Sequence, residues 1–95
     1  MRAGATSSAL ICLMVVAVLN FLVFFAVALY LGGDAANGKI DDGHFYLGSH
    51  GHYTEVSARV FAYSKWHTYS VWLTHSAAFI AACWLWLRDR TAPNA

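Results

Sequence analysis

Charged side chains are scarce in this sequence. Only 12% of the residues are Asp, Glu, Lys or Arg, against 59% that are hydrophobic, whereas about a quarter of the residues in a soluble domain are charged. The basic residues are scattered and the formal net charge is +1, so we do not expect a nucleic-acid partner. This composition requires an apolar solvent, and we expect the lipid bilayer to provide it.

Cysteines and catalytic motifs are also few. The two cysteines, Cys12 and Cys83, both fall in apolar stretches, so neither a disulfide framework nor a cysteine-based zinc motif is available. The sequence contains no nucleophile elbow, no P-loop and no His-Glu-x-x-His pattern. The acidic pair Asp41-Asp42 is most simply a turn. We therefore expect a protein that is not an enzyme.

The hydrophobic residues gather in two blocks. The first, residues 9–31, carries no charge; at about 1.5 Å per residue it would reach about 34 Å, enough for a hydrocarbon core of about 30 Å. The second runs from about Trp66 to Leu87 and has aromatic residues near both ends, as membrane-spanning helices do. Ser57 is a suitable helix N-cap, so this helix is expected to begin before the membrane.

These blocks predict an all-α membrane protein, an antiparallel hairpin of two transmembrane helices joined by a polar loop. The expected parts are an N-terminal tail, a first span, an extramembrane loop, a juxtamembrane helix continuing into the second span, and a C-terminal tail: residues 1–8, 9–31, 32–56, 57–87 and 88–95. A cleaved signal peptide is the alternative for the first block, because Arg2 precedes it and Ala26-Val27-Ala28 has the form of a cleavage site. Its length and phenylalanine content favour a membrane anchor.

The distribution of basic residues bears on orientation. The tails carry three, and the loop with the juxtamembrane helix also carries three. The position of Arg88 and Arg90 directly at a helix end favours cytoplasmic N- and C-termini. The short length and the two insertable blocks are typical of a multi-pass protein of a bacterial-type inner membrane.

Each span has a polar side chain near its middle. If Cys12 and Cys83 lie at one level in an antiparallel hairpin, then Asn20 and His75 are level about 12 Å deeper. A hydrogen bond that packs the two helices is the simplest role for this intramembrane pair. A proton path is the alternative, since histidine titrates near neutral pH.

Small residues form a stripe along the second block. The stripe contains His67, Ser70, Thr74, Ala78 and Ala81, with His75 and Ala82 at its edge. Ser70, Thr74, Ala78 and Ala82 recur every four residues, which permits close approach of another helix. We expect this stripe to face the first helix or an identical neighbour. The opposite face, with Trp72, Leu73, Phe79 and Ile80, is then expected to meet lipid.

The loop between the blocks has two parts. Its first dozen residues are rich in turn formers and are expected to be irregular. Residues 44–47 and 52–56 are rich in aromatic and β-branched side chains, which predicts a short β-hairpin or a compact loop around 48–51. Such a hairpin is marginal alone in water. We therefore expect Phe45, Tyr46 and Tyr53 to contact a larger membrane protein or a second copy.

Three histidines, His44, His50 and His52, lie close together in the loop, with Asp42 and Glu55 nearby. Imidazole and carboxylate groups bind zinc, copper or iron, although this spacing matches no standard motif. Haem would need two helices to contribute one histidine each, because His67 and His75 are about 12 Å apart along one helix. The primary expectation is that no cofactor is bound, with a metal ion or haem as the alternative.

These features favour a small membrane protein that acts by interaction, as an accessory subunit or an immunity- or inhibitor-type protein of a larger membrane complex. One alternative is a histidine-based metal or haem carrier. The other is an oligomeric proton-linked pore lined by Asn20, Thr74 and His75.

Overall fold

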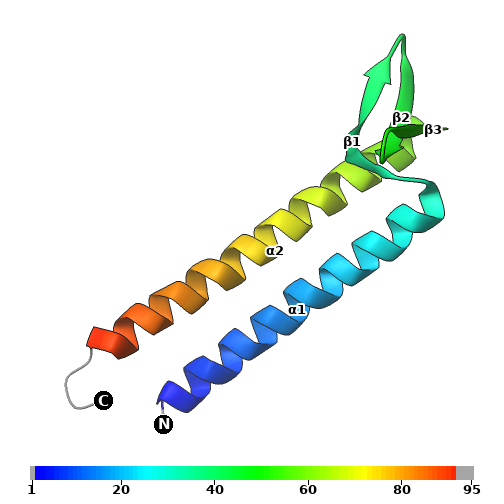
Figure 1. Ribbon diagram of the computed structural model, residues 1–95. Coiled ribbons are helices and arrows are strands. Elements are labelled where there is room, and N and C mark those ends of the chain that lie inside the picture. The colour runs from blue at the N-terminus through cyan, green and yellow to red at the C-terminus, as the bar shows by residue number, and fades with distance from the viewer. Residues whose placement is uncertain (1, 92–95) are drawn as a thin grey trace.

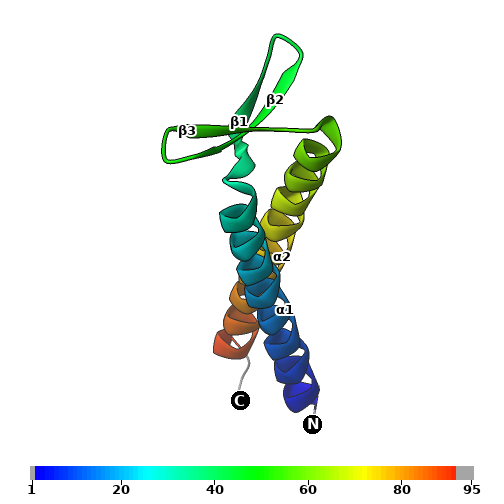
Figure 2. The ribbon, with the colours of Figure 1, turned by 90° about the vertical axis from the view of Figure 1, so that its right-hand side faces the viewer.

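The computed structural model describes residues 2–91. Two long helices run antiparallel, side by side, and a small β-sheet covers one end of the pair (Figures 1 and 2). In chain order the elements are α1 (Arg2–Leu31), β1 (Asp34–Asp41), β2 (His44–Ser49), β3 (His52–Val56) and α2 (Ala58–Thr91). The start of α1 and the end of α2 lie at the end of the helix pair away from the sheet (Figure 1). The expected tails, residues 1–8 and 88–95, are partly helical, because α1 begins at Arg2 and α2 ends at Thr91. Residues 1 and 92–95 lie outside the described residues.

The prediction of an all-α fold is wrong, because the segment that connects the two helices forms a three-stranded antiparallel sheet in the order β1-β2-β3. The hairpin of β2 and β3 was foreseen in outline, but β1 was not. Its sequence is rich in small and turn-forming residues, which have low strand propensity. Pairing with the central strand β2 outweighs that propensity.

Both helices are long and apolar enough to cross a membrane. α1 ends at two glycines, where the N–H groups of Gly32 and Gly33 both donate to the carbonyl of Ala28. Gly32 has a φ of 95°, the left-handed conformation that commonly closes a helix. At the start of α2 the Ser57 hydroxyl accepts a hydrogen bond of 3.1 Å from the Val60 N–H, which confirms the predicted N-cap.

The two helices meet along the small-residue stripe of α2. Ser70 and Thr74 accept hydrogen bonds from a side chain of α1, and Ala17 of α1 and Val71 of α2 are buried. The predicted outer face is exposed, with 59 to 70% of each side chain accessible at Trp72, Leu73, Phe79 and Ile80. The stripe therefore packs the hairpin, as predicted.

Two-residue turns join the strands. Asp42 and Gly43 connect β1 to β2, and His50 and Gly51 connect β2 to β3. All four residues have positive φ, between 49° and 83°, which a type I′ turn requires at both central positions and which matches the right-handed twist of the strands. An Asp-Gly turn is common in hairpins, and Asp and His are among the non-glycine residues enriched at positive φ.

An irregularity in β1 brings the strands unusually close. Asp34 pairs with Gly48, but the next paired residue, Lys39, faces Tyr46, so β1 carries three extra residues. The Asp34 carboxylate accepts hydrogen bonds from the N–H and side-chain amide of Asn37, which hold the extra residues in a bend. A side chain at Gly48 would overlap the backbone oxygen of Asn37. Glycine is therefore required there.

The sheet is fixed to the helices by a small core. Leu47 of β2 is fully buried, and Phe45, two residues earlier on the same face, packs against Phe61 of α2 with ring centroids 5.5 Å apart. The Ala35 N–H donates to the buried hydroxyl of Ser64 on α2, at 2.8 Å. The position of the sheet relative to the helices is thus set by both apolar and polar contacts.

Candidate functional site

A polar cluster lies between the two helices. The Asn20 side-chain amide donates to the Ser70 hydroxyl at 3.1 Å and to the Thr74 hydroxyl at 3.5 Å. Its oxygen lies 3.0 Å from Nε2 of His67, and Nδ1 of His67 lies 2.6 Å from the Tyr63 hydroxyl. One asparagine therefore joins α1 to three positions of α2, and His67 extends the cluster to Tyr63.

The direction of each hydrogen bond in this cluster follows from the hydroxyl groups. Ser70 and Thr74 donate their protons to backbone carbonyls of α2, so their oxygens accept from the Asn20 NH₂ group. The Asn20 oxygen must then face His67 and accept from an Nε2–H. Nδ1 of a neutral His67 is left as the acceptor for the Tyr63 hydroxyl. Every group is satisfied with a neutral histidine.

Asn20 is not paired with His75. The His75 ring is exposed; its Nδ1 donates to the Val71 carbonyl of its own helix at 3.1 Å, and its edge contacts the Phe21 ring. The two positions are nearly level, since Asn20 bonds Thr74 beside His75 and Phe21 beside Asn20 contacts the His75 ring. The predicted pair fails because His75 lies at the edge of the packing stripe and its side chain is exposed. The sequence does indicate His67 as a partner for α1, since it lies on the predicted packing stripe.

The exposed face of the sheet carries two of the three predicted interaction residues. Tyr46 and Tyr53 flank Lys39, whose ammonium lies 5.5 Å and 4.5 Å from the two ring centroids. Phe45 is on the other face, against Phe61, and serves the internal packing instead. A cation between aromatic rings is a rigid surface feature that a partner can contact.

The three loop histidines are not brought together. His44 lies on the exposed face, where its Nδ1 is 2.6 Å from a Glu55 carboxylate oxygen, His50 occupies the β2–β3 turn, and His52 begins β3. Among residues 2–91, no group of three or more His, Cys, Asp or Glu side chains is placed to hold a metal ion. Of the two helix histidines considered for haem, His67 has both ring nitrogens engaged within the cluster.

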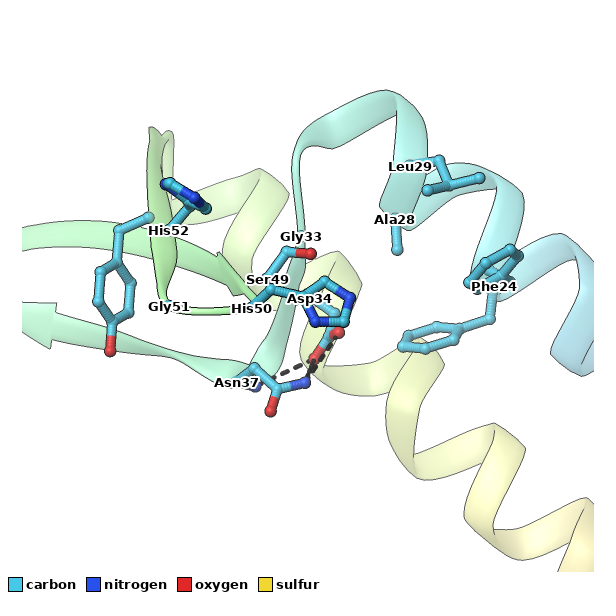
Figure 3. Close-up of a pocket in the computed structure, with 12 residues that line it drawn as sticks. Phe24, Ala28, Leu29, Gly33, Asp34, Asn37, Ser49, His50, Gly51 and His52 are labelled. Atoms are coloured by element: carbon cyan, nitrogen blue, oxygen red, sulfur yellow. Dashed lines mark hydrogen bonds between the residues drawn. The ribbon is translucent and has the colours of Figure 1, made fainter.

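A cleft of about 600 Å³ opens between α1 and the β2–β3 turn (Figure 3). One wall is apolar and comes from α1, with Phe24, Phe25, Ala28 and Leu29. The other wall is polar and comes from the sheet, with Asp34, Asn37, Ser49, His50, His52 and Tyr53. This volume is typical of small-molecule sites. The polar residues of this wall, apart from His50, His52 and Tyr53, were not singled out from the sequence.

Tryptophans mark two levels along α2. Trp66 has Lys65 over its ring, and Trp84 and Trp86 have Arg88 and Arg90 over theirs. These levels are separated by about 27 to 30 Å of helix, the thickness of a hydrocarbon core. Phe24 contacts His67, one residue beyond Trp66. The cleft therefore begins at the level of Trp66 and extends toward the sheet.

Comparison of this chain with protein-family models, with curated proteins and with solved structures finds no match.

Proposed function

We propose that this chain is a non-enzymatic, two-pass integral membrane protein that acts by interaction. In this proposal it is an accessory subunit, or an immunity- or inhibitor-type protein, of a larger complex in a bacterial-type inner membrane. The sheet lies on one side of the membrane, and both termini, beside Arg88 and Arg90, lie on the cytoplasmic side.

The exposure of the helices supports the membrane location. Only 6% of the most apolar window of α1 and 11% of that of α2 are buried within the chain. A core helix of a soluble protein would be mostly buried. Large apolar side chains instead cover the outer faces of both helices, and such faces require lipid or another protein.

The position of His75 is the main support for the proposed interaction. It lies near the midpoint between Trp66 and Trp86, thus near the centre of the proposed membrane, and it is exposed there. Its Nδ1 is satisfied within α2, whereas Nε2 has no partner within residues 2–91. Ionisable side chains at this depth face a protein interior or a polar partner. Because Nδ1 carries the proton of a neutral imidazole, Nε2 is an acceptor, and we therefore propose that a polar side chain of a partner helix donates a hydrogen bond to Nε2 of His75.

The exposed face of the sheet extends the same proposal outside the membrane. Tyr46, Lys39 and Tyr53 form a continuous aromatic and cationic surface, beside the pair of His44 and Glu55. Tyrosine is common at protein interfaces because it is rigid, large and able to hydrogen-bond. An extramembrane part of the partner would contact this surface.

Replacement of His75 tests the proposed helix contact. We expect His75→Leu to weaken the complex about 3- to 20-fold, the range that corresponds to loss of one intramembrane hydrogen bond. His75→Gln, whose amide reaches the position of Nε2, should restore most of the affinity. The measurement is the amount of partner retained by each variant after purification from the native membrane, against detergent concentration.

The control for this experiment is Leu73→Val, on the exposed face of the same helix. Leucine at position 75 also favours membrane insertion, so the variant is not expected to lose its fold. Equal retention of the partner by His75→Leu, His75→Gln and the unchanged chain would disprove the proposed contact.

A further inference from the structure

The cleft between α1 and the β2–β3 turn has an anionic end. The Asp34 carboxylate lies in its polar wall and accepts three hydrogen bonds, all from Asn37. A carboxylate offers about four acceptor positions, so it can receive one more donor. The C-terminus of α1 also faces the cleft through Ala28, Leu29 and Gly33. No basic residue lies in the last turn of α1 to balance the partial negative charge of that helix end.

The same wall also carries hydrogen-bond donors. His50, His52 and Ser49 line it, and neither imidazole has a hydrogen bond or ion pair within the described chain. Figure 3 shows His50 beside the bend formed by Asp34 and Asn37, across the cleft from Phe24 and Leu29 of α1. His50 is held by the turn with a φ of 49°. The polar wall therefore combines an acceptor for a cation with donors for an anion.

The opposite wall is apolar and continuous with the outer surface of α1. Phe25 and Leu29 line the cleft and expose 52% and 69% of their area. A ligand with its polar part against the sheet could thus lay an apolar chain along α1. The cleft lies on the sheet side of Trp66, at the level where phospholipid headgroups lie in the proposed membrane.

We infer that this cleft binds the headgroup of an aminophospholipid, with its ammonium group at Asp34 and its phosphate at His50 and Ser49. The inference rests on the membrane location proposed above. The charge favours this headgroup class, because the Asp34 carboxylate attracts an ammonium group and repels a purely anionic lipid. A primary ammonium can donate to the remaining acceptor position of Asp34, which a quaternary choline cannot do.

Competition between lipids with identical acyl chains tests the site. The full chain, purified in mild detergent, is offered phosphatidylethanolamine, phosphatidylglycerol and phosphatidylcholine in equal amounts, and retained lipid is measured by native mass spectrometry. We expect about tenfold preference for phosphatidylethanolamine. Soluble glycerophosphoethanolamine, which has no acyl chains, should compete only weakly. Equal retention of the three lipids, or preference for phosphatidylglycerol, would overturn the inference.

Filling the cleft gives the matched variants. Ala28→Leu places a larger side chain in the apolar wall and should remove the preference, whereas Ala26→Leu, on exposed helix surface outside the cleft, should keep it. His50→Asn replaces the imidazole by a side chain that tolerates positive φ. It should lower the retention of phosphatidylethanolamine several-fold. Circular dichroism confirms the fold of each variant. Unchanged preference in both Ala28→Leu and His50→Asn would contradict the site.

Failure of the lipid site and failure of the proposed function give different results. If only the lipid site is wrong, the chain still resists alkaline extraction from membranes and still loses its partner in His75→Leu. If the membrane location is wrong, the chain is released by alkaline extraction whatever lipids it retains.

Discussion

Replacement of Gly48 by alanine is expected to disrupt the β-sheet while leaving both helices in place. The added Cβ would overlap the backbone oxygen of Asn37 in β1, and a backbone atom within a paired strand cannot move aside as a flexible side chain can. We expect a destabilisation of the sheet of about 2 kcal/mol or more, in the range of other overpacked positions. Hydrogen exchange of the amides of β1 and β2 measures this directly.

Gly43→Asn is the matched control for the sheet. Gly43 lies in the turn between β1 and β2, a side chain there would meet open space, and its φ of 78° is one that asparagine tolerates. The protection of the β1 and β2 amides in Gly43→Asn should therefore stay close to that in the unchanged chain. If Gly48→Ala retains the same protection as Gly43→Asn, the close approach of β1 and β2 is not a feature of the protein.

Removal of Asn20 is expected to weaken the packing of α1 on α2. Asn20→Val keeps a similar volume but removes the hydrogen bonds to His67, Ser70 and Thr74. A hydrogen bond between membrane helices contributes about 0.6 kcal/mol on average and near 2 kcal/mol at most, so we expect a total loss of about 2 kcal/mol. Unfolding in detergent by increasing concentrations of dodecyl sulfate, followed by tryptophan fluorescence, gives the difference.

Leu19→Val is the control for this measurement, because Leu19 is the chain neighbour of Asn20 and is more than half exposed. A change at that position should alter the unfolding free energy by a few tenths of a kcal/mol. Equal unfolding curves for Asn20→Val and Leu19→Val would show that the cluster does not hold the helices together.

The sequence predicted the helices better than their connection. Long apolar runs and the Ser57 cap are local signals, and the helices follow them. β1 has no such signal, because Gly38 and Asn37 favour turns and become part of a sheet only through the bend held by Asp34. Strand formation there depends on pairing with β2, which is a tertiary interaction.

The candidate sites were predicted in part, for a related reason. Asn20 is predicted because a polar residue is conspicuous in an apolar block, but its partners depend on which side chains of α2 face α1. The orientation of α2 depends on contacts between residues distant in the sequence, such as the hydrogen bond from Ala35 to Ser64. The cleft joins residues from α1 and three strands, and no spacing along the chain indicates it.

The location of each part of the chain relative to a membrane tests the central proposal most directly. With Cys12 and Cys83 replaced by serine, single cysteines at positions 7, 41 and 91, all exposed, are treated with a membrane-impermeant maleimide in intact cells and in inverted vesicles. We expect positions 7 and 91 to be labelled from the cytoplasmic side and position 41 from the other side. Labelling of position 41 from the same side as position 91, or absence of position 7 from the mature chain, would contradict a two-pass membrane protein.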